Sequence, residues 1–387
     1  MTDPARGFPT QEFRDRATRA QSLMATHGLD VLLLTTEPEV QYYTGFLTRF
    51  WESPTRPWFV VLPAQGAPIA VIPSIGAHLM RQTWVTDIRT WQAPDYSDDG
   101  IGLLADTLRA VTPNTGRIGI ADAMESHVRM PLADLHRLQS TLGPRQVVGD
   151  RQITRQLRMV KSEAEVDKIR AAAQVADRAF ARVNEIATSG TALSQVFREF
   201  QALCLTEGAD WVPYLAGAAG RNGYGDVISP ATDVPLRTGD VLMLDTGLVR
   251  DGYFCDLDRN FCVGTQDGTV AEAHAQLIDA TRAGFDAARP GALVSDLFHA
   301  MNHVANPGGS AMDAGRLGHG LGMQLTEWPS IIPDDHTPLV PGMVMTLEPS
   351  VSLGDGRIMV HEENIVIRDG GAEWLSTPQT ADIRVLA

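Results

Sequence analysis

The chain has 387 residues, more than one ordinary hydrophobic core holds, so two domains are expected. Hydrophobic residues make up 44% and charged residues 20% of it, as in soluble globular proteins. The formal net charge of −15 argues against nucleic-acid and anionic-membrane partners, because both require basic surface patches.

The beginning of the chain and its cysteines bear on location. The opening residues, MTDPARGFPTQEFRDRATRA, lack the apolar core of about 7–15 residues that marks a secretory signal peptide. No run approaches the ~18–20 apolar residues that span a bilayer. Three cysteines, an odd and small number, fit a reducing compartment. We therefore expect a cytoplasmic protein with no membrane partner.

The first half alternates between helical and strand patterns. Residues 10–28 predict an amphipathic helix, and residues 101–111 predict another. Buried strands are predicted at 30–36, 57–63, 68–74 and 117–122. This alternation predicts an α/β domain over residues 1–155.

A longer second region begins near residue 155. Ser162 and Glu165 form a capping box in front of a long helix that ends near residue 190. Further helices are predicted at 193–208 and 269–289, with strand pairs between and after them. Helices segregated beside antiparallel hairpins predict an α+β domain over residues 156–387.

Three aspartates lie inside an apolar, strand-like stretch, VLMLDTGLVRDGYFCDLDRNF, residues 241–261. The Asp-Gly pair at 251–252 predicts a hairpin turn. Depending on where that turn is centred, Asp245 lies opposite Asp256 or opposite Asp258. In either register the three carboxylates share one face, where like charges destabilise a sheet. A divalent cation explains their burial better than a solvated acidic face does.

Two later segments add candidate ligands. The run GRLGHGLGM places His319 among four glycines, where a backbone with few side chains lets the imidazole reach a site. Glu348 ends the apolar strand VMTLEPSV, and the strand RIMVHEENIVI carries Glu362 and Glu363. The turn at 354–356 predicts a second hairpin, in which Glu348 lies opposite Glu362.

Two hairpins and one imidazole thus supply five candidate metal ligands: Asp245, Asp256, His319, Glu348 and Glu362. Carboxylate-rich sets of this kind hold two ions about 3.5–4 Å apart. The set predicts two divalent ions of Mn, Fe, Co or Zn rather than a thiol-preferring metal.

The order and spacing of these segments resemble the pita-bread metallopeptidase superfamily, in the branch of aminopeptidase P, prolidase and creatinase. GLDVLLLTTEPEVQYYTGF resembles the opening of that branch's amino-terminal domain, and MVKSEAEVDKIRAAA resembles its domain-joining helix. LMLDTG, DLDRNF, GHGLG, LEPSV and HEENIVI follow in family order. The candidate ligands are separated by 11, 63, 29 and 14 residues, as in prolidases. The resemblance implies an α/β amino domain plus an α+β pita-bread catalytic domain.

The resemblance also implies roles for single residues. It assigns metal ligation to the five residues above and prefers Glu362 to Glu363. It implies that a metal-activated water attacks a scissile carbonyl while Glu348 carries the proton. The catalytic candidates are Glu348, His319, Thr326 and His361.

Three side chains that hold the substrate in peptidase relatives are absent. The histidine 17 residues before the first aspartate ligand is Ile228 here, and the histidine 7 residues after the ligand histidine is Thr326. The arginine two residues before the last glutamate is Val360. Candidates to take over contacts with the substrate are Tyr224, Asp226, Thr326, Glu327 and His361. These departures predict a substrate other than a generic proline peptide.

The loop TRFWESPTRPWF, residues 48–59, concentrates Trp51, Arg56 and Trp58 between prolines. Loops rich in Trp and Arg are typical of binding surfaces, where Arg binds carboxylates and Trp binds cations. The loop is therefore predicted either to line a substrate pocket or to make a plain contact in a homodimer.

Three hypotheses for function follow. The first, which we favour, is a metal-dependent hydrolase that cleaves an amide-type C–N bond in a dipeptide or a small amino-acid derivative. The second is a metal-dependent lyase acting on a small zwitterion, or a metal-free enzyme similar to creatinase or ectoine hydrolase. The third, a binding module without catalysis, is disfavoured because all five candidate ligands are present.

Overall fold

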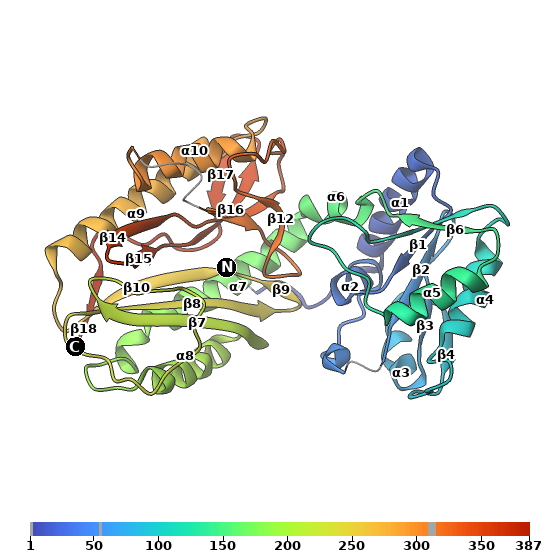
Figure 1. The fold of residues 1–387 in the computed structure, drawn as a ribbon, viewed down its shortest axis with the longest axis horizontal. Helices are drawn as coiled ribbons and strands as arrows, with labels where there is room; N and C mark the ends of the chain where they lie inside the picture. Colours follow the sequence, from blue (N-terminus) through green and yellow to red (C-terminus); the bar gives the residue numbers. More distant parts are fainter. Residues whose placement is uncertain (1–2, 54–55, 309–314) are drawn as a thin grey trace. The chain divides into compact units, whose positions relative to one another are not determined.

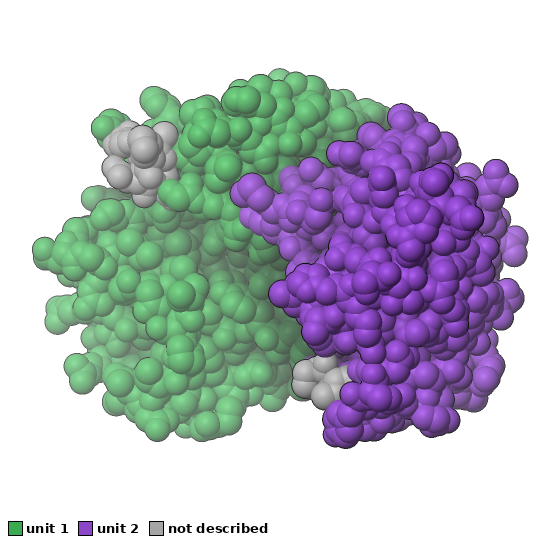
Figure 2. All heavy atoms as spheres, turned by 45° about the vertical axis from the view of Figure 1, so that its right-hand side comes forward, with its two compact units in different colours: residues 1–4, 159–387 green, residues 5–158 purple. Residues whose placement is uncertain are grey.

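The computed structural model describes residues 3–53, 56–308 and 315–387. It consists of two compact units, residues 5–158 and residues 159–387, the second including the first residues of the chain (Figure 2). Asp3 joins the second unit through an ion pair of 2.6 Å with Arg250. The division falls close to the predicted boundary after residue 155.

The amino-terminal unit is built on a six-stranded mixed sheet of order β4-β3-β2-β1-β5-β6 (Figure 1). Its strands are β1 Val31–Leu34, β2 Phe59–Pro63, β3 Ile69–Pro73, β4 Asp87–Trp91, β5 Arg117–Ile120 and β6 Gln146–Gly149. Its helices are α1 Thr10–His27, α2 Glu37–Thr44, α3 Ala77–Met80, α4 Ile101–Val111, α5 Leu132–Thr141 and α6 Ile153–Met159. Apolar residues of β1, β2, β3 and β5 pack against α4 and α5, which confirms the predicted α/β class.

The carboxyl-terminal unit contains two larger sheets. One has the order β18-β10-β8-β7, and β9 pairs with β8. Its strands are β7 Trp211–Arg221, β8 Asp240–Arg250, β9 Tyr253–Phe254, β10 Leu257–Val263 and β18 Arg384–Leu386. The other has the order β12-β11-β13-β16-β17. Its strands are β11 His319–Gly320, β12 Glu327–Ser330, β13 Val344–Leu347, β16 Glu363–Arg368 and β17 Gly371–Trp374. A separate hairpin consists of β14 Ser350–Gly354 and β15 Arg357–Val360.

Four helices back these sheets: α7 Glu163–Ala181, α8 Leu193–Glu207, α9 Gly268–Ala287 and α10 Val294–Ala305. Helix α7 begins with the predicted capping box, in which the Ser162 N–H donates to Glu165 Oε2 at 2.9 Å. Residues of α7 and α8 form a core with the first sheet, whereas α9 packs over β14 and β15 (Figure 1). None of the helices in the described ranges is both long and apolar enough to cross a membrane.

Candidate metal centre

The hairpin of β8 and β10 carries the aspartates on one face. Its loop, Asp251-Gly252, has positive φ at both residues (49° and 79°), as a tight two-residue turn requires. The resulting register puts Asp258 directly opposite Asp245 and so decides between the two predicted alternatives. The even-numbered leucines of β8 pack in the core with α7 and α8. Side chains alternate along a strand, so Asp245 faces the other side of the sheet.

A second pair of hairpins carries the glutamates. Strand β13 pairs with β16, and β14 pairs with β15, in one register from Val344 as far as Ser352, where an irregularity shifts it. Glu348 lies between β13 and β14, and Glu362 lies between β15 and β16, so the register sets the two glutamates opposite each other, as the sequence predicts. The next residue, Glu363, is turned to the other side, where its carboxylate accepts a hydrogen bond of 2.9 Å from Arg259.

Two side chains tie these hairpins together. The Asp256 N–H donates to Asn364 Oδ1 at 3.1 Å, and Asn364 Nδ2 donates to the Asp256 carbonyl at 2.6 Å. Arg259 Nη1 donates to the carbonyls of Asp258 and Glu362, both at 2.7 Å. These bonds connect the backbone of the two hairpins at the acidic residues. They therefore hold the aspartates of one hairpin beside the glutamates of the other.

His319 reaches the same place from β11. A Cβ at Gly318 or Gly320 would lie 2.4 Å or 2.0 Å from a backbone oxygen of a neighbouring strand, so glycine is required on both sides of the histidine. His319 Nδ1 lies 2.8 Å from the Gly320 carbonyl, and Nε2 lies 3.4 Å from Asp256 Oδ2. Burial lowers the pKa of His319 to about 4, so the ring is neutral, the form that binds metals.

Asp256, His319 and Glu362 form the tightest group of possible ligands among the described residues. One ligand atom of each lies within 4.8 Å of the others, and all three residues are buried. Asp245 and Glu348 are outside this trio, although both raise the pKa of Asp256 electrostatically. The structure therefore brings three of the five predicted ligands to one point and sets the other two beside it.

The carboxylates of this group lie close together with little compensating positive charge. Burial, and then repulsion by neighbouring carboxylates, raises the pKa values of four acids well above their ordinary range; these are Asp245, Asp256, Asp258 and Glu362. One buried oxygen of each has no hydrogen-bond partner in the described part of the chain. Oxygen atoms left without a donor beside a neutral imidazole are the ligands that divalent metals take. The residues present therefore fit a divalent metal centre.

Two residues beside this centre were missed from sequence. Tyr214 on β7 donates its hydroxyl to Asp245 Oδ2 at 3.0 Å. Arg316 is exposed and makes no hydrogen bond or ion pair with any described residue, yet its charge opposes the rise in the pKa of Glu348, which burial brings to about 7. The signal for Arg316 was its position three residues before the ligand histidine.

Three predicted substrate contacts are engaged elsewhere. The Tyr224 hydroxyl donates to Asn260 at 3.0 Å and accepts from a backbone N–H at 2.7 Å. The Asp226 carboxylate closes a local turn by accepting from two backbone N–H groups. Glu327 forms a buried ion pair of 3.1 Å with Lys161. Each of these side chains therefore binds another group of the protein.

The remaining catalytic candidates differ in their surroundings. His361 is buried on the opposite side of its strand from Glu362, and its Nε2 lies 3.2 Å from Glu363 Oε1. Its ring packs edge-on against His274, with centroids 6.2 Å apart. Thr326 is exposed just before β12. His361 therefore packs on the face opposite Glu362 and does not belong to the trio.

The tryptophan-rich loop is turned into the amino-terminal unit. Trp58 is 2% exposed, and its ring packs against those of Phe46 and Trp51, with centroid distances of 5.2 Å and 6.0 Å. Arg129 holds the loop by donating to the Trp51 carbonyl at 2.7 Å and to the Arg56 carbonyl at 3.3 Å. Residues 54–55 of this loop lie outside the described ranges. Both tryptophans thus contribute to the packing of their own unit.

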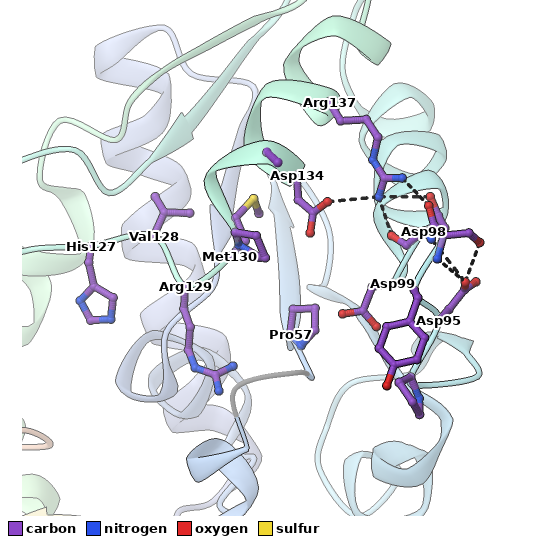
Figure 3. A pocket seen from close by; sticks show the side chains of 15 residues that line it. Pro57, Asp95, Asp98, Asp99, His127, Val128, Arg129, Met130, Asp134 and Arg137 are labelled. Carbon is purple, nitrogen blue, oxygen red and sulfur yellow. Dashed lines mark hydrogen bonds and ion pairs between the residues drawn. The ribbon is translucent and has the colours of Figure 1, made fainter.

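A hollow of about 780 Å³ opens in the amino-terminal unit (Figure 3). Its charged groups are largely satisfied by one another: Arg137 donates to the Ser97 and Asp98 carbonyls at 2.8 Å and 2.6 Å, and Asp95 accepts from Ser97. It contains none of the predicted metal ligands. The chemistry therefore lies in the carboxyl-terminal unit.

A carboxylate–histidine group on paired hairpins, in a fold of this kind, defines a metal-dependent hydrolase with the pita-bread fold. Residues 167–369 match the model of metallopeptidase family M24, and residues 16–160 match the creatinase/prolidase N-terminal domain. The chain belongs to metallopeptidase family M24.

Similar proteins span nearly all of the chain. A probable dipeptidase PepE of Mycobacterium tuberculosis is 31% identical over 380 residues, 97% of each chain. The solved structure of dipeptidase PepE from Mycobacterium ulcerans is 28% identical, with a TM-score of 0.83 over 98% of this chain and 99% of that one. A prolidase from Thermococcus sibiricus, 21% identical with a TM-score of 0.86, shares the fold over 97% of this chain and 99% of its own.

Proposed function

We propose that this protein is a dinuclear metallo-dipeptidase that hydrolyses the amide bond of a small substrate with a free carboxylate. The proposal rests mainly on the buried trio Asp256, His319 and Glu362. It combines a neutral imidazole with carboxylate oxygens that have no hydrogen-bond partner among the described residues. Asp245 and Glu348 complete the proposed ligand set. The likeness to proteins named dipeptidase, over 97% of the chain, supports the substrate class.

Bound divalent ions would supply Lewis acidity and lower the pKa of a water towards about 7. Glu348 is the proposed proton carrier, because it lies beside the trio, opposite Glu362, and matches the glutamate with that role in peptidase relatives. Tyr214 holds Asp245 in one orientation by its hydrogen bond of 3.0 Å.

Recognition of the substrate differs from that in peptidase relatives. Ile228 is 78% exposed, and Val360 is buried in an apolar core, so neither provides the polar contact found in those relatives. Arg316 is the proposed replacement for the missing arginine, since its guanidinium has no partner among the described residues and guanidinium groups bind carboxylates well. The homodimer and the cytoplasmic location expected from sequence remain predictions. The three cysteines are free and buried.

The test combines metal analysis with product analysis. Protein purified without chelator is expected to contain about two divalent ions per chain. It should release free amino acids from a dipeptide panel with and without proline at the second position. Glu348→Gln is expected to slow turnover by about 10²–10⁴-fold, whereas the exposed Glu272→Gln should not change it.

Two results would contradict the proposal. The first is release of no amino acid from any dipeptide in the presence of Mn, Fe, Co or Zn. The second is formation of an unsaturated product from a small zwitterion without uptake of water, which would identify the lyase instead.

A further inference from the structure

Asp258 is a buried carboxylate that the five-ligand set does not use. The residue is 1% exposed and lies directly opposite Asp245 in the β8–β10 ladder. Its Oδ1 is buried and has no hydrogen-bond partner among the residues described. Two carboxylates paired across a ladder repel each other, so a compensating group is required between them.

The pattern of contacts at Asp258 is that of the proposed ligands. Asp245, Asp256 and Glu362 each also leave one buried oxygen unpartnered. The nearest cation, Arg259, does not neutralise Asp258 directly. Its guanidinium donates to the Asp258 carbonyl at 2.7 Å and to the Glu363 carboxylate at 2.9 Å, on the other side of the strand.

The charge balance of the centre also supports a role for Asp258 in metal binding. With Asp258, five carboxylates lie in or beside the trio: Asp256, Asp258 and Glu362 are buried, and Asp245 and Glu348 are half-buried. Two divalent ions supply four positive charges, which a five-carboxylate centre accommodates without excess positive charge. Asp258 is outside the trio that contains His319, and in the ladder it pairs with Asp245.

We propose that Asp258 is a further metal ligand that binds beside Asp245, its partner in the ladder. This inference rests on the proposed dinuclear centre. Carboxylate oxygens suit hard divalent ions such as Mn²⁺, which is therefore the ion used to test it.

Metal binding by full-length variants tests this proposal. Wild type, Asp258→Asn and a matched control, Asp177→Asn, are stripped with chelator and titrated with Mn²⁺ by calorimetry, and metal content is measured after desalting. Asp177 also approaches Arg259, at 3.5 Å, but on the side with Glu363. Asp258→Asn is expected to bind one of its two Mn²⁺ ions at least tenfold more weakly than wild type. The control should match wild type.

Thermal melting without metal gives a second, independent readout. Removing one of two opposed charges should make metal-free Asp258→Asn melt at a higher temperature than metal-free wild type, and the added metal should raise its melting temperature less. A purely structural aspartate would give the reverse order. If Asp258→Asn fails to fold, Asp258→Ser is measured in the same way.

The outcomes separate this inference from the proposed function. If Asp258→Asn binds two Mn²⁺ ions with wild-type affinity, the inference is wrong and the five-ligand centre stands. If wild type binds no metal after reconstitution, both are overturned. Unchanged metal binding with weaker binding of dipeptides would make Asp258 a substrate contact and would likewise overturn its role as a ligand.

Discussion

At the scale of single residues, the charge around Glu348 is set by one exposed arginine. Burial raises the pKa of Glu348 to about 7, and Arg316 is the cation that opposes the rise. Arg316 also acts on His319, whose pKa it helps to lower. Arg316, which has no bonded partner in the part of the chain that the structure describes, thus influences both the proposed proton carrier and a proposed ligand.

Replacing Arg316 with glutamine is expected to raise KM for dipeptides by about tenfold or more, because a charge-assisted hydrogen bond to the substrate carboxylate is lost. Dipeptide amides, which have no carboxylate, should be cleaved equally by wild type and Arg316→Gln. Steady-state kinetics on matched acid and amide substrates measures the difference. Arg289→Gln, at the exposed end of α9, serves as the control. An equal loss on both substrates would contradict the assignment.

Much of the candidate site follows from the sequence, because strand alternation places residues on faces without any knowledge of packing. The alternation put Asp245, Asp256 and Asp258 on one face, although only the observed loop chose the register. Contacts that depend on a third strand were not predictable. Tyr214 pairs with Gly247 on the neighbouring strand and reaches Asp245 diagonally, a contact that depends on a pairing the sequence does not specify.

At the scale of elements, the first residue of helix α2 has an unusually high pKa for a glutamate. Glu37 begins the helix, and burial raises its pKa from 4.5 to about 7, against the opposing charge of Arg129. Between these two values the folded protein keeps a proton that the unfolded chain has released. The free energy of unfolding therefore decreases as the pH rises through this window. The stabilisation from this proton is complete below pH 4.5 and is lost by about pH 7.

Glu37→Gln removes the titrating group and is expected to melt at a higher temperature than wild type at about pH 8. At pH values below 4.5 both proteins carry a neutral side chain and should melt alike. Thermal melts across this range measure the difference, with Glu272→Gln as the control. Parallel curves for wild type and Glu37→Gln would contradict the assignment.

The two strands of the amino-terminal sheet that sequence patterns missed have a common physical cause. Strands β4 and β6 are the two edges of the amino-terminal sheet, and most of their residues are partly or fully exposed. Edge strands bury too little to produce an apolar run, so periodicity does not indicate them. Central strands such as β1, which is buried throughout, were predicted at nearly their observed positions.

At the scale of the whole molecule, each unit has its own hydrophobic core. The core of the amino-terminal unit contains only residues from that unit, and the clusters around the metal centre contain only residues of the other. The proposed metal ligands all belong to the carboxyl-terminal unit.

Chelation of the metal is expected to lower the melting temperature of only one of two calorimetric transitions. Ions that bind only the folded state stabilise the unit that holds them, by about 2.7 kcal/mol at a concentration one hundred times Kd. Scanning calorimetry of the full chain with and without chelator measures this shift, and restoring Mn²⁺ should reverse it. A single transition, or an equal shift of both, would show that the units unfold together.

The tight hairpin loops also limit how this sequence can change in length over evolution. Inserting or deleting one residue inside β8, between Asp245 and the loop, would send that carboxylate to the side of the sheet that packs on α7 and α8. Inside a strand, a single-residue change needs a bulge to absorb it, as between Ser352 and Gly354 in the β14–β15 hairpin. Descendants of this protein can therefore vary the length of the loop more easily than the distance from each acidic residue to the loop.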